Sequence, residues 1–188
     1  MKSKDNNLRR LADRIEINDC LCRYARGVDR GDLELVASTY HDDAYDDHDE
    51  YKGSAAGFID WLRARFATVD NSIHFLGNCL IEFAGDDFAF VETYFVSRRL
   101  RAPTEAEQAN LDPNDALCRQ RWGRYLDSFE RRKGHWRIAR RIVVTEALFM
   151  SVARDGLRRD EPTWGRRHPS DLLFVEREAL MLKARGEP

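Results

Sequence analysis

The chain lacks any long apolar run. No stretch reaches the roughly 18 to 20 residues that a membrane-crossing helix needs, and no leader-like apolar segment stands at the start. It also lacks a block of charge of one sign, because 31 Lys and Arg are mixed among 33 Asp and Glu, for a formal net charge of −2. A nucleic-acid-binding protein would gather its basic residues on one face. We therefore expect a soluble protein with neither a membrane nor a nucleic acid as its partner.

Cysteine is scarce, and the four residues present fall in stretches typical of helix or strand interiors. This predicts free thiols and a reducing cytoplasm. Cys20 and Cys22 would point about 200° apart on a helix, so they cannot grip one zinc ion together. Residues 41–50 crowd acidic and histidine side chains but match neither a calcium-binding EF-hand loop nor an H-E-x-x-H zinc helix. Phosphate-binding loops, nucleophile elbows and dinucleotide fingerprints are also missing. We expect no metal and no cofactor.

The first third of the chain has apolar residues at helical spacing. It predicts a long helix that ends near a glycine and two shorter helices that begin at a capping residue. These helices and their boundary residues are 7–26 with Gly27, 33–40 with Asp32, and 54–67 with Ser54.

The middle of the chain predicts an antiparallel meander. A short strand over 44–48 precedes four long runs rich in β-branched and aromatic residues, with turns at 85–87 and 133–134. The long runs are 72–84, 88–100, 117–132 and 135–152. A chain of 188 residues suits one domain, so we predict an α+β fold over 1–155, in which three helices pack on a curved sheet that encloses a pocket. Two segments stand outside this meander: 102–115, an excursion between strands, and 156–188, an extension that packs on the domain or on a neighbouring subunit.

His74 is a polar residue in a strongly apolar strand. Alternation places it on one sheet face with Leu76 and Asn78. Asp29, directly after the first helix, is placed to hold one imidazole nitrogen while the other faces the pocket. Such a carboxylate fixes the tautomer and makes a general base that becomes an acid in the next step. The alternative for His74 is a buried histidine bonded to a nearby carbonyl.

Three further residues are candidates for the same site. Tyr24 offers a phenol as donor or proton relay, and it converges with Asp29 if the helix breaks near Gly27. Arg141 shares a strand face with small and apolar residues, and a buried guanidinium needs an anion. It either pairs with Asp29 or Glu146 or stabilises a developing oxyanion. His48 is a candidate proton donor in the pocket wall.

The chain resembles the SnoaL-like branch of the nuclear transport factor 2 superfamily over residues 9–152. The motifs that carry the resemblance are YARGVD at 24–29, GDL at 31–33, IHFLGN at 73–78 and GHWRIARR at 134–141. Within that superfamily it is most similar to the lyases that use no cofactor, namely scytalone dehydratase, hexachlorocyclohexane dehydrochlorinase and bile-acid 7α-dehydratase, and it also resembles the lignin diarylpropane lyases.

The resemblance implies an α+β cone and roles for individual residues. By motif position Asp29 and His74 would be the proton-abstracting pair, with Tyr24 at the tyrosine of the bile-acid enzyme and Arg141 at an arginine of the dehydrochlorinase. His48 falls where scytalone dehydratase has a catalytic tyrosine. Further substrate contacts are expected from Tyr45, Asn78, Tyr94, Trp122 and Tyr125, and the expected pocket aromatics also include Phe75 and Phe149.

The function that follows is a lyase acting without a cofactor. It would eliminate water or formaldehyde from a bulky aromatic or polycyclic alcohol, such as a lignin-derived diaryl compound or a steroid. Two alternatives stay open because fold does not determine function: a non-catalytic small-molecule-binding protein and the small subunit of a ring-hydroxylating dioxygenase. The open face of a curved sheet usually needs covering, so we expect a homo-oligomer, a trimer ahead of a dimer by the family resemblance.

Overall fold

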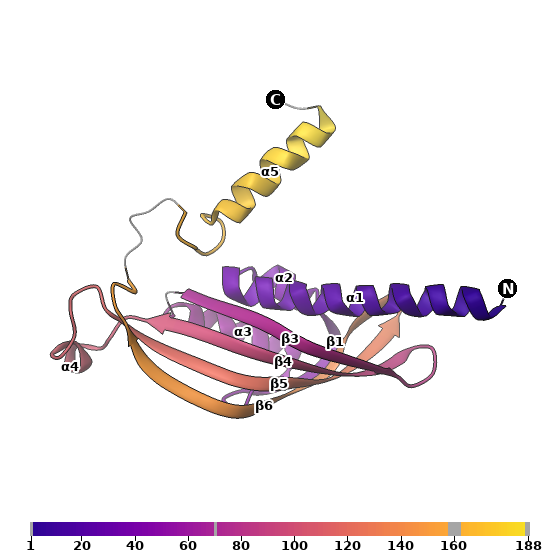
Figure 1. Cartoon of the computed structure of the whole chain (residues 1–188), viewed down its shortest axis with the longest axis horizontal. Helices are drawn as coiled ribbons and strands as arrows, with labels where there is room; N and C mark the ends of the chain where they lie inside the picture. The colour runs from indigo at the N-terminus through magenta and orange to yellow at the C-terminus, as the bar shows by residue number, and fades with distance from the viewer. Residues whose placement is uncertain (1, 70, 158–162, 187–188) are drawn as a thin grey trace.

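The structure is a computed structural model that describes residues 2–69, 71–157 and 163–186. Three helices cover one face of a six-stranded sheet, and a fifth helix stands away from it (Figure 1). The helices are α1 (Lys2–Arg30), α2 (Leu33–Ala37), α3 (Ala55–Phe66), α4 (Glu105–Gln108) and α5 (Leu172–Arg185). The strands are β1 (Tyr40–Asp47), β2 (Lys52–Ser54), β3 (Asn71–Phe83), β4 (Phe88–Arg101), β5 (Ala116–Arg132) and β6 (His135–Ala153). Within the described residues, no helix is long and apolar enough to cross a membrane.

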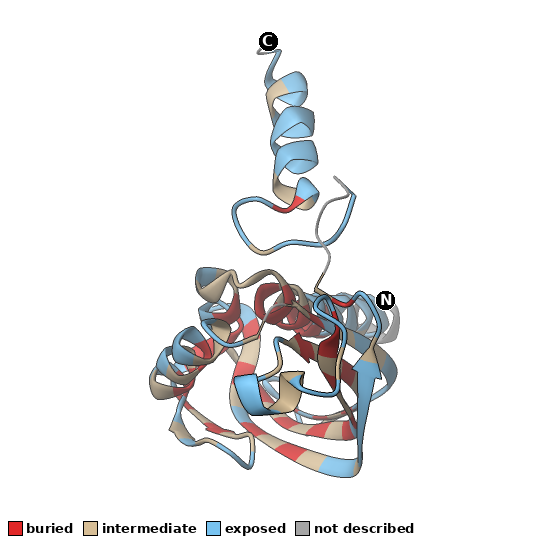
Figure 2. Ribbon diagram, turned by 90° about the vertical axis from the view of Figure 1, so that its left-hand side faces the viewer, coloured by how far each residue is buried: buried red, intermediate tan, exposed pale blue. Residues whose placement is uncertain are grey.

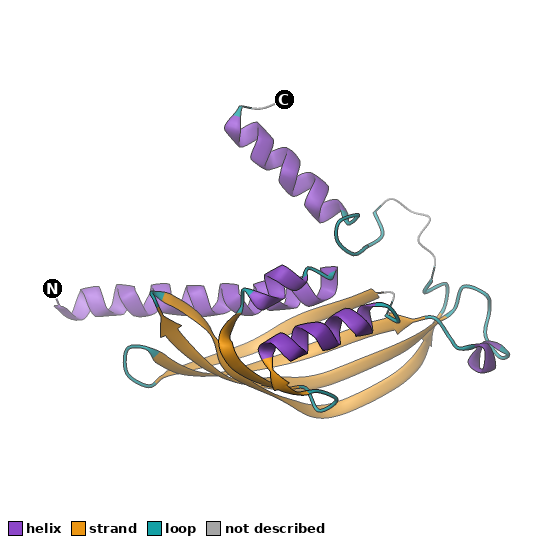
Figure 3. Cartoon of the chain, turned by 180° about the vertical axis from the view of Figure 1, so that it is seen from behind, coloured by secondary structure: helices purple, strands orange, loops and turns teal. Residues whose placement is uncertain are grey.

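The sheet has the strand order β2-β1-β6-β5-β4-β3. All neighbours run antiparallel except β1 and β6, which are parallel. The sheet curves around α3 and does not close on itself (Figure 3). The predicted α+β class is therefore confirmed, and the four predicted long strands coincide with β3 to β6 to within a residue or so at each end.

The first helix runs past the glycine that was expected to end it. It continues to Arg30, and Gly31, with φ +72°, makes the left-handed turn. Gly27 is needed for a different reason: a Cβ there would lie 2.7 Å from Val36 Cγ2, so it allows α2 to pack closely on α1. The predicted cap at Asp32 is confirmed, since its side chain accepts a hydrogen bond from the Leu35 amide at 2.9 Å.

Three irregularities reverse the in-and-out alternation of the long strands. On β3 the register shifts between Leu76 and Cys79, so two residues lie opposite one of β4. On β6 one extra residue is Glu146, because Thr145 pairs with Gly123 while Ala147 pairs with Trp122. The other is Ala139, because Ile138 pairs with Phe129 while Arg140 pairs with Ser128. Side chains beyond each bulge therefore turn to the face opposite to the one that simple alternation predicts.

The hydrophobic core fills the space between the helices and the concave face of the sheet. Figure 2 shows buried residues along the inner side of the strands and on the helices that face them. Its largest fully buried side chains include Trp136, Tyr24, Tyr40, Tyr125, Phe58 and Phe129. Two tyrosines of this core, Tyr24 and Tyr125, also line the pocket described below.

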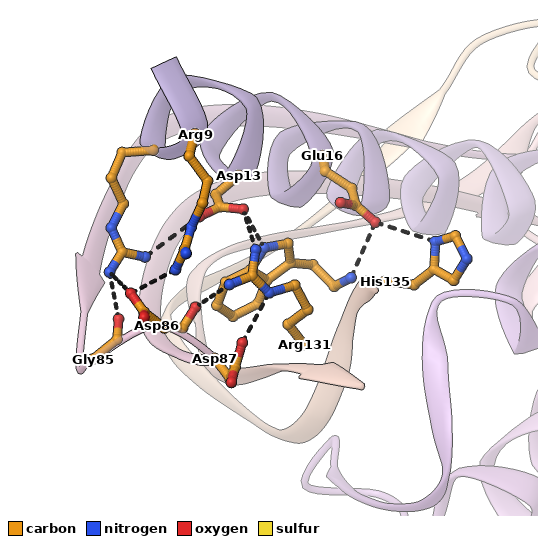
Figure 4. A network of polar contacts seen from close by, with 10 residues as sticks. Arg9, Asp13, Glu16, Gly85, Asp86, Asp87, Arg131 and His135 are labelled. Atoms are coloured by element: carbon orange, nitrogen blue, oxygen red, sulfur yellow. Dashed lines mark hydrogen bonds and ion pairs between the residues drawn. The ribbon is translucent and has the colours of Figure 1, made fainter. Parts of the chain in front are cut away.

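A polar clamp ties the N-terminal half of α1 to two hairpins of the sheet (Figure 4). Asp13, 4% exposed, accepts hydrogen bonds from Arg131 Nη1 at 2.9 Å and from the indole of Trp136 at 3.0 Å. Arg9 and Arg10 reach Asp86 in the β3–β4 turn. This clamp fixes how the long helix crosses the sheet, and thereby where its other end meets β3.

The segment before α5 attaches to the far end of α1. Arg30 forms an ion pair with Asp171 at 3.0 Å, and its carbonyl accepts a hydrogen bond from the His168 amide at 2.6 Å. The helix α5 itself projects from the body of the molecule and has no buried residue (Figures 1 and 2). Residues 158–162 and 187–188 of the predicted extension lie outside the described residues.

Candidate active site

Asp29 and His74 meet at the junction of α1 and β3. The imidazole Nδ1 lies 2.6 Å from Asp29 Oδ1, and the backbone amide of His74 donates to Asp29 Oδ2 at 2.7 Å. Both carboxylate oxygens are therefore committed to one residue. Because the carboxylate accepts at Nδ1, that nitrogen carries the proton, and Nε2 is left as the proton acceptor. Nε2 makes no hydrogen bond to any residue that the structure describes.

The imidazole of His74 opens onto an apolar pocket. The pocket is partly open to solvent and leaves about 60 Å³ of room for the centres of water-sized spheres. The side chains of α3 that line it are Phe58, Trp61, Leu62, Arg65 and Phe66, and those of the sheet include His48, His74, Phe95, Ser97, Tyr125 and Val143. Such a site is concave and mostly apolar, with a few polar groups directed into it.

A second histidine stands in the same pocket with its own aspartate. His48 Nδ1 makes a short hydrogen bond to Asp46 Oδ1, and the other oxygen of Asp46 accepts from the Tyr40 hydroxyl at 2.6 Å. His48 Nε2 lies 2.9 Å from the Tyr24 hydroxyl. With the proton on Nδ1, Nε2 accepts a hydrogen bond from the Tyr24 hydroxyl, so Tyr24, His48 and Asp46 form one connected chain.

Burial determines the charge states along this chain. Desolvation lowers the pKa of His48 below its ordinary value near 6.5, although Asp46 opposes the shift. Desolvation also raises the pKa of Tyr24 well above 10. His48 is therefore a neutral imidazole at neutral pH, and Tyr24 is a neutral phenol whose oxygen faces the pocket.

The convergence of Tyr24 and Asp29 does not need the predicted break in α1. Tyr24 is 2% and Asp29 is 7% exposed on one continuous helix, which packs on α2 and β3. Tyr24 reaches His48, just after β1, whereas Asp29 reaches His74 on β3. Because the two residues contact different segments, they serve two separate pairs that line one pocket.

Arg141 does not reach the pocket, and neither predicted partner pairs with it. It is 0% exposed and makes two hydrogen bonds of 2.7 Å to Asp127, its cross-strand neighbour on β5. Its guanidinium lies over the rings of Tyr24 at 4.1 Å and Tyr125 at 4.0 Å. Glu146 instead pairs with Arg124 on the outer face. Arg141 therefore stacks on two tyrosines of the pocket wall instead of entering the pocket.

Four residues predicted to contact substrate lie away from this pocket. Tyr94 and Trp122 line a hollow on the outer face of the sheet, Tyr45 packs under Arg140, and Asn78 is exposed in the β3 bulge. Period-two alternation explains the first three. Tyr125 and His48 face inward, so Trp122 and Tyr45, each three positions earlier, must face outward, and so must Tyr94, next to the buried Phe95. The predicted pocket aromatics Phe75 and Phe149 are likewise on the outer face, at 74% and 52% exposed.

Sequence reasoning missed the two aspartates that organise the site. Asp46 and Asp127 are both 0% exposed, next to buried apolar or aromatic residues of the same strands, Ala44 for Asp46 and Tyr125 and Phe129 for Asp127. That pattern was a usable signal, because a carboxylate at an inward position must meet a donor. The crowded segment 41–50 contains His41 and Asp46, but they are placed for separate hydrogen bonds. No group of three or more potential metal ligands occurs among the residues that the structure describes.

Comparison with known proteins places this geometry in context. A family model described as the SnoaL-like domain matches residues 9–142. No curated protein matches the chain significantly. Solved structures share the fold at low identity. A type 2 hexachlorocyclohexane dehydrochlorinase (LinA) has 20% identity and a TM-score of 0.67, covering 77% of this chain and 93% of its own.

Two other solved structures illustrate the range of proteins with this fold. A protein assigned as a scytalone dehydratase from Novosphingobium aromaticivorans has 18% identity and a TM-score of 0.64, covering 82% of this chain and 99% of its own. A protein of unknown function from Mycobacterium tuberculosis has 21% identity and a TM-score of 0.58, covering 73% of each chain. At these identities the likeness concerns the fold alone.

Proposed function

Because the chain belongs to the SnoaL-like domain family, we propose that it is a lyase that needs no cofactor. The proposed reaction removes water, or formaldehyde, from a bulky aromatic or polycyclic alcohol, such as a lignin-derived diaryl compound or a steroid. The observation that supports it most is the Asp29–His74 pair, with its free Nε2 directed into an apolar pocket. The dehydrochlorinase and the dehydratase with the same fold lend support by analogy.

In the elimination, His74 Nε2 takes a proton from a carbon beside an activating group. The electron pair of that C–H bond forms the new double bond, and the neighbouring C–O bond breaks. The departing hydroxide receives the proton back from the imidazolium and leaves as water, so the enzyme is regenerated. Asp29 holds the ring in place and stabilises its positive charge during the step.

The hydrogen-bonded residues Tyr24, His48 and Asp46 stabilise the departing oxygen. Tyr24 and His48 line the same pocket as His74, and Asp46 holds His48 from behind. When the Tyr24 hydroxyl turns from His48 to the leaving oxygen, it donates a hydrogen bond to the developing charge. In the formaldehyde variant, His74 takes the proton of the hydroxyl, the C–C bond breaks, and the carbon left behind takes that proton.

A screen of aromatic and steroid alcohols, without added cofactor and with EDTA present, tests the proposal. New conjugated absorbance reports elimination, and a formaldehyde assay separates the two reactions. We expect His74→Ala to lower kcat/KM by at least roughly 10²-fold, the usual contribution of a general base. Asp29→Asn should reduce it similarly, because the amide no longer stabilises the imidazolium.

The matched control is His135→Ala. His135 is mostly exposed, with its side chain 69% accessible, and it pairs with Glu16 far from the pocket (Figure 4). Its removal should leave the rate unchanged. Wild-type activity in His74→Ala would refute the lyase. Tight binding of these alcohols with no turnover in any variant would instead support a protein that only binds small molecules.

A further inference from the structure

The outer end of the pocket is strongly cationic, in contrast to its apolar interior. Four guanidinium groups gather around Glu50: Arg119 Nη1 lies 2.8 Å and Arg121 Nη2 3.9 Å from its Oε1, and Arg65 makes a short contact to its Oε2. Arg99 is the fourth, and its pKa is affected by the others. Four positive charges and one negative charge leave an excess of about +3 at this end of the pocket.

The strand register places these arginines at a defined distance from the imidazole. His74 pairs with Ser97 on β4, which pairs with Arg121 on β5. Two strand spacings of about 4.8 Å therefore separate the backbones of His74 and Arg121 by roughly 10 Å. One step further toward the mouth, about 7 Å along the strands, Arg99 pairs with Arg119. The cationic end and the base thus share one face of the sheet.

Several donors at this end have no acceptor among the residues that the structure describes. The side chain of Arg99 makes no hydrogen bond or ion pair to any of them. Arg121 is 6% exposed, and its Nε is buried without a partner. The hydroxyl of Ser72, which is opposite Arg99 in the ladder and 2% exposed, is also unpaired. All three residues line the pocket.

Burial and the crowding of like charges together shift the pKa of Arg99. Burial, followed by the charges of Arg65 and Arg119, lowers the pKa of Arg99 to about 9. Like charges directly across a ladder, as in Arg99 and Arg119, destabilise the sheet. A buried guanidinium without an anion costs free energy that a bound anion offsets.

We propose that the substrate carries a carboxylate, and that Arg99 and Arg121 bind it while the alcohol end of the substrate faces His74. A carboxylate fits because the planar fork of arginine binds its two oxygens side by side. This inference deepens the proposed lyase function and rests on it for the orientation of the reacting end. The substrate is therefore an aromatic or polycyclic hydroxy acid whose carboxylate and reacting carbon lie at different ends of the molecule.

A pair of probes that differ only in charge tests the proposal. The probes are trans-stilbene-4-carboxylate and trans-stilbene-4-carboxamide, whose Kd values are measured by calorimetry at fixed ionic strength. We expect the wild-type protein to bind the acid roughly tenfold or more tightly than the amide. Arg121→Met and Arg99→Met should reduce the affinity for the acid to that for the amide and leave amide binding unchanged.

Two further variants sharpen the test. Arg98→Met removes an arginine next to Arg99 on the same strand but on the opposite sheet face, and should change neither Kd. Glu50→Gln removes the carboxylate that competes for the arginines, so it should tighten binding of the acid. Far-ultraviolet circular dichroism of each variant checks the fold. If Arg121→Met does not fold, Arg99→Met, whose side chain is less buried, carries the same test.

The outcomes separate this inference from the proposed function. His74→Ala should keep the preference for the acid, because charge recognition does not use the base. Loss of turnover with this preference intact supports both proposals, whereas inactivity of the wild-type protein with the preference intact contradicts the lyase alone. Equal Kd values for acid and amide in the wild-type protein, or equal weakening of both probes by the arginine variants, would overturn the carboxylate site.

Discussion

The two pocket histidines differ in which ring nitrogen is available. Each donates a hydrogen bond from Nδ1 to an aspartate. Nε2 of His48 accepts a hydrogen bond from Tyr24, whereas Nε2 of His74, a pocket-lining residue, has no described partner. The first arrangement holds a phenol in place, and the second presents a base. The two histidines therefore support different steps because the Tyr24 hydroxyl is bonded to Nε2 of one and no described group is bonded to Nε2 of the other.

The buried, neutral state of His48 makes stability depend on pH. Its pKa is lowered in the folded protein, so below about pH 6.5 the unfolded chain binds a proton that the folded protein does not. The free energy of unfolding should fall as the pH drops through 6.5, by up to ~1.4 kcal/mol per unit from this group, and the effect should level off below the folded pKa.

Urea unfolding between pH 5 and 8 checks this expectation. His48→Gln keeps hydrogen-bonding groups near Asp46 and Tyr24 but does not titrate, so its stability should decline less over the same range. Parallel pH profiles of the wild-type and variant proteins would show that His48 is not the group responsible.

At the scale of elements, the long helix α1 carries the site because both of its ends are fixed. Asp13 clamps the N-terminal half to the β5–β6 hairpin, and Asp29 joins the C-terminal end to β3. The sequence pattern predicted the helix but placed its end near Gly27. A glycine within a helix and one that ends it look alike in sequence, and only the contact with Val36 distinguishes them.

Asp13→Ala should destabilise the protein by about 3 kcal/mol. It removes the acceptor of the Arg131 guanidinium and the Trp136 indole, and the indole is fully buried. Asp86→Ala is the matched control, because Asp86 pairs with Arg9 and Arg10 at the surface, where such pairs contribute about 1 kcal/mol or less. Chemical denaturation measures both variants, and equal losses would refute the distinction between them.

At the scale of the whole molecule, the outer face of the sheet is rich in exposed aromatic residues. Phe75 is 74%, Phe149 52%, Trp122 49% and Tyr94 46% exposed. Exposed apolar surface of this kind is typical of an interaction site. With the family resemblance, it supports the expectation of a homo-oligomer in which a second copy covers this face.

Sedimentation velocity tests this expectation. We expect a species heavier than the 21.9 kDa chain, with a trimer favoured over a dimer. Phe75→Ser should shift the protein toward the monomer, since it removes the most exposed aromatic side chain of this face. Leu8→Ser, at a 63% exposed position of α1, should leave the mass unchanged. A wild-type monomer at all concentrations would contradict the homo-oligomer.

Local periodicity was sufficient to predict the fold class and most elements. The spacing of apolar residues marked α3 and the four long strands, and the caps at Asp32 and Ser54 lie within a few residues of the groups that they bind. The Asp29–His74 encounter was also predictable although 45 residues separate the two, from a histidine in an apolar strand, a carboxylate directly after the first helix and the motifs of the resemblance.

By itself the sequence determined the helices and the strands, since those depend on neighbours a few residues apart, and its motifs indicated a polar pair in an apolar pocket. Only the tertiary structure decided that Arg141 pairs with Asp127, that His48 is held by Asp46, and that four arginines meet at Glu50. The Arg141–Asp127 pair and the meeting of the arginines depend on strand register and on single-residue bulges, whereas the His48–Asp46 contact depends on both side chains turning to the same face where β1 ends. One extra residue in a strand reverses the face of every side chain beyond it, and the local pattern does not reveal where that residue falls.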